Sequence, residues 1–169
     1  ELITGATSGD VTIPASVLIN DISYNVVSIG NSAFQNASIT SCTIGANITS
    51  IGTSVFQDCS SLTSVTFQGN VPTVGELAFS GIKEAATLTL NSPNGFSESK
   101  IGDHTFTSVL LIDSQFTYSV NTTNVTVSIT DYNSDSLDVT IPASVDISGS
   151  DYNVVSIGNS AFQNASITS

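Results

Sequence analysis

The chain has 169 residues, of which 40% are apolar and 9% are charged, and its formal net charge is −12. Only Lys83 and Lys100 are cationic, so the composition excludes nucleic acid as a partner and disfavours anionic membrane surfaces. Serine and threonine supply 50 residues, so hydroxyls carry the polarity, and the chain is not of the highly charged class that stays disordered. No apolar run approaches the roughly 20 residues that cross a bilayer, so we expect no membrane insertion of this segment.

Residues 11–41 are the first recognisable element, and they occur twice. Residues 139–169 repeat them at an offset of 128 positions, with 26 of 31 residues identical. Such segments are copies of one module, and the second stops in mid-pattern, so we expect a piece of a longer tandem array rather than a self-contained enzyme. The five differences fall at 18 and 20–23, in a predicted loop after the Val-Thr-Ile-Pro strand. In that loop, copies of the module could acquire different partners.

A shorter unit follows inside the module. It begins at Ser28, Ser50 and Thr73, with Ile or Val, then glycine, and four residues later phenylalanine; a degenerate copy begins at Lys100. The first three are spaced 22 and 23 residues apart, within the range of leucine-rich repeats. The glycine of each unit predicts a tight bend.

Each unit continues to a predicted strand, over residues 39–44, 62–67 and 85–90. Apolar residues at the last and third-last positions, flanking a threonine, indicate that one strand face turns inward. A unit of about 23 residues cannot bury its apolar face alone, so stacked units must share a core. The sequence therefore predicts a mostly-β α/β repeat fold, a leucine-rich-repeat solenoid with a parallel sheet on one face and short irregular or helical returns on the other.

The pattern S-I-G-x-x-A-F-x-x-C-S-S-L-T-S-V-T-F, present here over residues 50–67, resembles the BspA-like leucine-rich repeats of bacterial and protozoan surface proteins. The lead-in from Val11 to Pro14, followed by Tyr24-x-Val26-x-Ser28-Ile29-Gly30, is also typical of that family. The resemblance covers about 11–106 and 139–169.

Residues 115–130 read as two alternating strands around a turn at 121–124, a β-hairpin that joins tandem modules. We place the module boundary near 112. Residues 1–112 are then a solenoid module that is incomplete at its N-terminus, and residues 113–169 are the hairpin and the start of the next copy. Residues 1–10 correspond loosely to the second strand of such a hairpin.

The residues that could carry chemistry are few. His104 is the single histidine, in a degenerate unit, and we expect a surface side chain without a catalytic partner. Cys42 and Cys59 occupy slots that are apolar in sister units, which favours buried free thiols, with a disulfide as the alternative. Asp131-x-Asn133-x-Asp135 resembles the start of a calcium loop, but the required glycine and glutamate are missing. We therefore expect no metal, no cofactor and no enzymatic activity.

Hydroxyl side chains recur at the outward positions of the predicted strands. In register, they form ladders spaced about 4.8 Å apart. A β-branched polar residue such as threonine is also common on the solvent-exposed face of a strand, without any role in binding. The alternative is a surface that binds glycans or a protein through many neutral hydrogen bonds, although it lacks the aromatic residues that favour tight binding. The candidate binding residues are Thr12, Thr43, Thr66 and Thr89 in one row, with Thr140 in the second copy, and Ser41, Ser64 and Thr87 in the other.

Five Asn-x-Ser/Thr sequons are candidate N-glycosylation sites if the protein is secreted from a eukaryotic cell. They are Asn36, Asn47, Asn121, Asn124 and Asn164.

The resemblance to BspA-like proteins implies a non-enzymatic, extracellular cell-surface adhesin or antigen. Its partners would be host extracellular-matrix proteins, cell-surface proteins or glycans, which copies of one module would bind by avidity. The alternative is a structural stalk or a filament that self-associates end to end.

Overall fold

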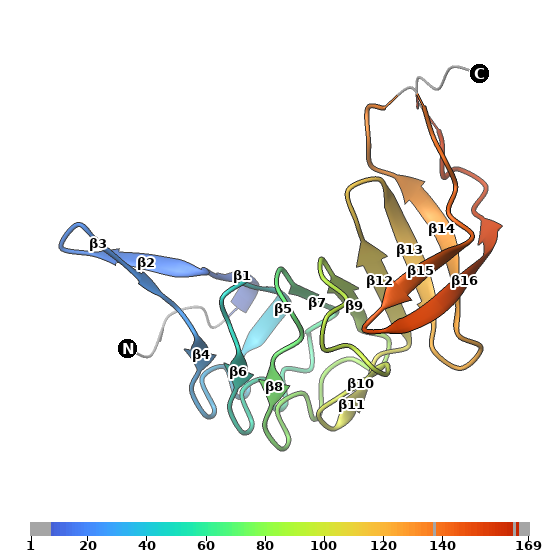
Figure 1. Cartoon of the computed structure of the whole chain (residues 1–169). Helices are drawn as coiled ribbons and strands as arrows, with labels where there is room; N and C mark the ends of the chain where they lie inside the picture. The colour runs from blue at the N-terminus through green and yellow to red at the C-terminus, as the bar shows by residue number, and fades with distance from the viewer. Residues whose placement is uncertain (1–7, 137, 164, 166–169) are drawn as a thin grey trace.

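The computed structural model describes residues 8–136, 138–163 and 165. These residues form strands and turns, and none of them is helical. The returns between the predicted strands, for which the sequence predicts irregular or helical segments, are therefore turns, irregular segments and short strands (Figure 1). Of residues 1–10, for which a hairpin strand is predicted, residues 1–7 lie outside the described part of the chain, and residues 8–10 begin a strand that pairs in parallel with the next coil.

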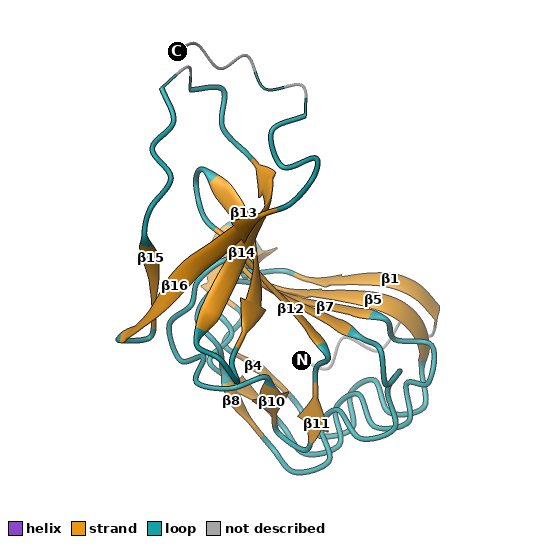
Figure 2. Ribbon diagram, turned by 90° about the vertical axis from the view of Figure 1, so that its right-hand side faces the viewer, coloured by secondary structure: helices purple, strands orange, loops and turns teal. Residues whose placement is uncertain are grey.

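One parallel sheet runs along the stacked coils, as the repeat predicts. Cys42 pairs with Val65 and Val65 with Leu88, so equivalent residues of successive units lie side by side. Figure 2 shows these strands as one layer, with the turns on the far side of the coils. The parallel strands are β1 (Ser8–Ile13), β5 (Ser38–Ile44), β7 (Ser64–Phe67), β9 (Thr87–Leu90) and β12 (Ser108–Ile112).

A smaller sheet lies across the core from the main one. Its strands pair in parallel and belong to the Ile-Gly segments of the first three units. In the core, the rings of Phe34, Phe56 and Phe79, from the turns after these strands, stack at centroid distances of 5.4 and 5.2 Å. The ring of Phe106 continues this column edge-on at 5.9 Å from Phe79. The strands are β4 (Ser28–Ile29), β6 (Ser50–Ile51) and β8 (Thr73–Val74).

In the second and third units, the glycines Gly52 and Gly75 are needed for a different reason from the predicted bend. The left-handed φ values of about +56° fall two residues later, on Ser32, Ser54 and Leu77. A Cβ on Gly52 would lie 2.9 Å from the nitrogen of Asn31 in the coil before it. Glycine is thus required there because successive coils touch backbone to backbone.

The fourth unit departs from the stack. Its Ile-Gly segment does not join the small sheet, because β10 (Lys100–Ile101) turns back and pairs with β11 (His104–Thr105). Gly102 allows this turn with φ +62°.

The predicted loop around residues 18–23 is a hairpin. Strands β2 (Ser16–Ile19) and β3 (Ile22–Asn25) are joined by Asn20 and Asp21, both with positive φ, as a two-residue turn requires. The hairpin projects away from the coils, and most of its residues are exposed (Figure 1).

The hairpin predicted at 115–130 is present as β13 (Phe116–Asn121) and β14 (Thr126–Tyr132). Asp113 begins it, since one carboxylate oxygen accepts hydrogen bonds from the Gln115 and Phe116 amides. The second copy then forms β15 (Ser144–Ile147) and β16 (Ser150–Ile157). Because β13 pairs with β12 and β16 with β14, one nine-stranded sheet runs through position 112, and the module boundary there stays a prediction.

Candidate functional site

The predicted threonine row is present in the main sheet. Thr12 pairs with Thr43, Thr43 with Thr66, and Thr66 with Thr89, so these side chains leave the sheet on one face. Adjacent parallel strands lie about 4.8 Å apart, which sets the spacing of the hydroxyls. The row has the predicted geometry, and its role in binding stays a prediction.

The second row lies beside the first on the same face. Ser41 pairs with Ser64, and Ser64 with Thr87. The residue between the two rows of each strand is buried, as Val65 is in β7, so both rows face outward. The sequence did not place Ser108, which pairs with Thr87 and extends this row. Its signal was the short apolar run Val-Leu-Leu-Ile that follows Ser108, which the blurred repeat before it concealed.

The outward face continues across the β13–β14 hairpin. Leu110 interrupts the first row after Thr89, but it pairs with Ser119, and Ser119 pairs with Ser128. The Ser156 hydroxyl then donates to the Ser128 hydroxyl oxygen over 2.7 Å. We call this surface the hydroxyl face; it consists of Thr12, Ser41, Thr43, Ser64, Thr66, Thr87, Thr89, Ser108, Ser119, Ser128 and Ser156. It offers neutral donors and acceptors.

An anionic group closes the N-terminal end of the second row. Asp10 pairs with Ser41 in the sheet register, and its carboxylate accepts hydrogen bonds from the hydroxyls of Ser41 at 2.7 Å and Thr40 at 2.8 Å. These two bonds lower the pKa of Asp10 below its ordinary value of 3.8. The carboxylate therefore remains charged in neutral solution.

His104 is not the surface side chain that the sequence predicts. It is half-buried, and its ring packs edge-on against Phe106 at 4.8 Å. Its Nε2 atom is buried without a hydrogen-bond partner in the described part of the chain. Burial lowers the pKa of His104, and the neighbouring Asp103 opposes this effect. This setting favours a neutral ring with a packing role.

Cys42 and Cys59 are buried free thiols, as their apolar slots predict. The Cys59 thiol donates to the carbonyl of Phe34 over 3.0 Å. Burial raises the pKa of Cys42 to about 12, and it also raises the pKa of Cys59. Both groups therefore stay protonated and unreactive at neutral pH.

The asparagine side chains of the sequons differ in their exposure and in their hydrogen bonds. Asn36, Asn121 and Asn124 are exposed. The amide nitrogen of Asn47 donates to the carbonyl of Ala15 and to the Asn25 side chain, so a glycan, which replaces one of its two hydrogens, would remove one of these bonds. Asn164 lies outside the described residues.

Asp131 lies in β14, and Asn133 and Asp135 lie in the irregular segment that follows it. The Asp131 carboxylate accepts from the Tyr132 amide, and the Asn133 side-chain nitrogen donates to the Thr117 hydroxyl. Within the described ranges, no three His, Cys, Asp or Glu side chains gather as a metal site. The same ranges contain no helix with the length and apolarity to cross a membrane.

Comparisons with known proteins bear on the repeat. The family described as the BspA type leucine rich repeat region matches residues 27–168 in six copies. A solved structure of a leucine rich cell surface protein from Faecalibacterium prausnitzii A2-165 is similar, with a TM-score of 0.40 and 19% identity. The likeness covers 98% of this chain and 69% of that chain. No curated protein matches the chain in sequence.

Proposed function

Because this chain belongs to the family of BspA-type leucine-rich repeat proteins, we propose that it is a non-enzymatic extracellular adhesin or antigen of the cell surface. In this proposal, tandem solenoid modules bind host matrix proteins, cell-surface proteins or glycans. Each module contributes a modest affinity, and several modules on one chain raise the total by avidity.

The hydroxyl face is the observation that carries this proposal. The first row runs in register from β1 to β9 and continues, past Leu110, through Ser119 and Ser128 to Ser156. The second row runs from β5 to β9 and ends at Ser108. A flat array of neutral donors and acceptors matches the hydroxyl-rich surface of a glycan. Each net hydrogen bond contributes about 1 kcal/mol, so many must act together.

The β2–β3 hairpin offers a second contact with a protein partner. Leu18, Ile19, Ile22 and Tyr24 are exposed on it, which is unusual for large apolar side chains. Its tip also contains the positions at which the two copies of the module differ. Protein partners would therefore be selected by the hairpin rather than by the hydroxyl face.

The test is a binding screen of the purified chain against arrayed glycans and matrix proteins. A hit through the hydroxyl face should weaken at least about tenfold in the double variant Thr43→Val and Thr66→Val, which removes two hydroxyls at nearly constant volume. Thr53→Val is the matched control, because Thr53 is exposed on a turn outside the main sheet. Equal binding by all three proteins would contradict a role for the hydroxyl face.

The alternative function is a structural stalk or filament. The exposed apolar side chains of the β2–β3 hairpin favour it, since such a surface also suits association between modules. Analytical ultracentrifugation and electron microscopy separate the two functions. End-to-end assembly by a chain that binds nothing on the arrays would favour the structural alternative.

A further inference from the structure

The fourth unit ends in a hairpin instead of adding a further parallel strand to the small sheet. Residues 100–106 form this segment, and we call it the fourth-unit hairpin. Its turn lies against β8, the last strand of the small sheet, since a Cβ on Gly102 would be 3.0 Å from the Cγ1 atom of Val74 (Figure 1). Its inward side chains include Ile101 and Phe106, which are 6% and 2% exposed. The fourth-unit hairpin therefore closes the core beside β8.

Backbone hydrogen bonds join the turns of the first three units, but none joins the turn of the third unit to the fourth-unit hairpin. The Phe34 amide donates to the second coil over 2.9 Å, and the Phe56 amide donates to the third coil over 2.7 Å. In residues 8–136, no backbone bond links the equivalent amide of Phe79 to the fourth unit. Side-chain packing replaces it, because the rings of Phe79 and Phe106 meet edge-on at 5.9 Å. The fourth-unit hairpin thus depends on ring packing where the other units depend on backbone bonds.

His104 is part of this packing. It pairs with Ile101 across the hairpin, and its ring lies edge-on against Phe106 at 4.8 Å. Its Nε2 atom is buried and has no hydrogen-bond partner in the described part of the chain. A neutral imidazole fits this place at the cost of one unused bond, since only one of its nitrogens carries a proton. A protonated imidazole carries a proton on both nitrogens, so protonation would put a charged donor where no acceptor lies.

The charged side chains on the elements around His104 do not provide that acceptor. Asp103 is exposed at the preceding position, and its charge favours the protonated ring. Lys100 is exposed at the start of β10, and Glu76 is exposed in the turn after β8. Burial outweighs the charge of Asp103, so the pKa of His104 lies below its ordinary value of 6.5. The closed hairpin therefore favours the neutral ring.

We propose that the fourth-unit hairpin is an acid-sensitive closure of the solenoid, in which protonation of His104 releases residues 100–106 from the third coil. Release would uncover Val74 in β8 and the ring of Phe79, which the hairpin covers when it is closed. This closure would act in the same way whatever the chain binds at its surface.

The direction of the pH effect follows from the two states of the hairpin. In the open state His104 lies in water and its pKa returns to about 6.5, whereas the closed state keeps its pKa lower. The closed state is therefore fully stabilised above pH 6.5, and it loses this stabilisation as pH falls from 6.5 through the lower value. Aspartate and glutamate side chains are largely ionised down to about pH 5, so His104 dominates the change above that pH.

The test measures how firmly the hairpin is closed at pH 7.5 and at pH 5.0. Hydrogen exchange of the whole chain is followed by NMR, and the rates are corrected for the intrinsic effect of pH. The Phe106 amide donates to the Ser99 carbonyl over 2.9 Å, and its protection should fall at least about threefold at pH 5.0. Leu88 is the internal reference, because its strand lies between β7 and β12, and its protection should change less.

The ring of His104 gives a second readout, because the chain contains one histidine. Its NMR signals should titrate at a lower pH in the folded chain than in concentrated urea. The ring signals of Phe106 should shift over the same pH range, since the two rings are in contact. Equal titration midpoints in the folded and the unfolded chain would overturn the proposal.

Two variants assign the effect to the His104 ring. His104→Phe keeps an aromatic ring on Phe106 and cannot be protonated, so the protection of the Phe106 amide should become equal at the two pH values. Asp103→Asn removes the carboxylate that favours the protonated ring, and should enlarge the fall in protection at pH 5.0. Because Asp103 is exposed, the second variant tests the closure even if the first does not fold.

Four exchange results would overturn the proposal. The first is protection of the Phe106 amide that does not change between the two pH values, and the second is a fall that persists in His104→Phe. The third is an equal fall at Leu88, which would indicate a general loosening of the chain in acid. The fourth is a fall that Asp103→Asn leaves unchanged or reduces.

Discussion

The two copies of the 31-residue element have nearly the same sequence and different surroundings. Residues 11–36 are followed by a coil that covers them, whereas the described part of the second copy is packed on the β13–β14 hairpin that precedes it. The backbone hydrogen bonds within their hairpins and following turns still match. The comparison shows that local sequence fixes the local hydrogen bonds, while neighbouring coils decide which side chains are buried.

The hairpins of the two copies also differ in burial, but here the second copy is the more buried one. Tyr24 in β3 is 49% exposed, and its counterpart Tyr152 in β16 is 5% exposed. The β15–β16 hairpin is part of the nine-stranded sheet, and its Ser148 hydroxyl donates to the Pro93 carbonyl, whereas β2–β3 projects alone (Figure 1). The first copy is therefore covered on its coil side and the second on its hairpin side.

The largest effect should come from the isoleucine that the coil covers. Ile13→Ala removes a side chain that is almost fully buried, and should lower the free energy of unfolding by about 3 kcal/mol. Ile141→Ala changes the same position in the second copy, where the side chain is exposed, and should cost less than about 1 kcal/mol. Urea unfolding followed by circular dichroism measures both. Equal losses would show that Ile141 is covered in solution.

In the hairpins we expect a smaller difference in stability loss, and here the substitution in the second copy should cost more than the one in the first. Ile147→Ala should lower the free energy of unfolding by about 2 kcal/mol, because Ile147 is buried against the sheet. Ile19→Ala should cost about 0.5 kcal/mol, the contribution of a cross-strand pair with Ile22 on an isolated ribbon. The measurement is the same urea titration. A loss at Ile19 as large as that at Ile147 would mean that the projecting hairpin is also docked.

The smallest effect concerns Asp10 and its counterpart Asp138. The Ser41 and Thr40 hydroxyls lower the pKa of Asp10, so its contribution to stability is complete above the ordinary value of 3.8 and is lost as pH falls through the lower folded value. Asp10→Asn should therefore be less stable than the wild type at pH 7, and the difference should disappear near pH 2. Thermal unfolding at both pH values checks this.

Asp138→Asn is the control for the acidic pair. No hydrogen bond reaches the Asp138 side chain from the residues that the structure describes, so this substitution should leave the melting temperature nearly unchanged at both pH values. A pH-dependent loss in Asp138→Asn equal to that in Asp10→Asn would contradict the role of the coil hydroxyls.

The period of the repeat predicted the stacked coils correctly, because every unit must bury apolar side chains at the same positions. The register of Thr43 with Thr66 followed from aligning the units, and so did the buried positions of Cys42 and Cys59. The hairpin at 116–132 was predicted from alternation alone.

What depends on contacts between coils could not be predicted from one unit. Gly52 is required by its distance to Asn31 in the coil before it, which no local pattern reveals. The fourth unit turns back at Gly102, and His104 packs on Phe106 as a result. The β2–β3 hairpin was predicted as a loop because the sequence signal of its Asn-Asp turn is weaker than that of Asn-Gly.

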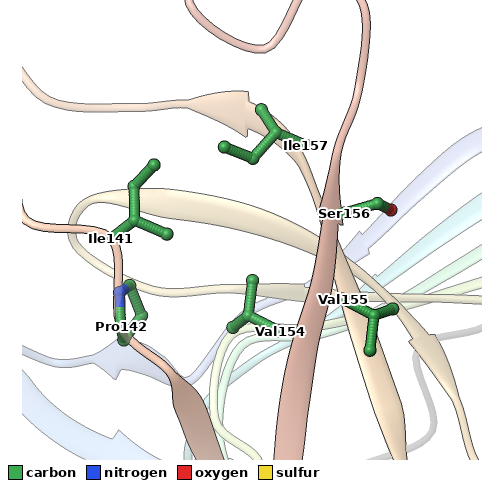
Figure 3. Close-up of a pocket in the computed structure, with 6 residues that line it drawn as sticks. All are labelled: Ile141, Pro142, Val154, Val155, Ser156 and Ile157. Atoms are coloured by element: carbon green, nitrogen blue, oxygen red, sulfur yellow. The ribbon is translucent and has the colours of Figure 1, made fainter.

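The β13–β14 hairpin has a consequence for the direction of the protein. Strand β13 reverses the chain relative to β12, and β14 reverses it again, so β16 runs the same way as the strands of the coils. Two reversals cancel, so the second copy joins the main sheet in parallel through a strand that contains Ser156 and Ile157 (Figure 3). Their counterparts Ser28 and Ile29 belong to the small sheet of the first copy, so the same sequence serves in either of the two sheets of the molecule.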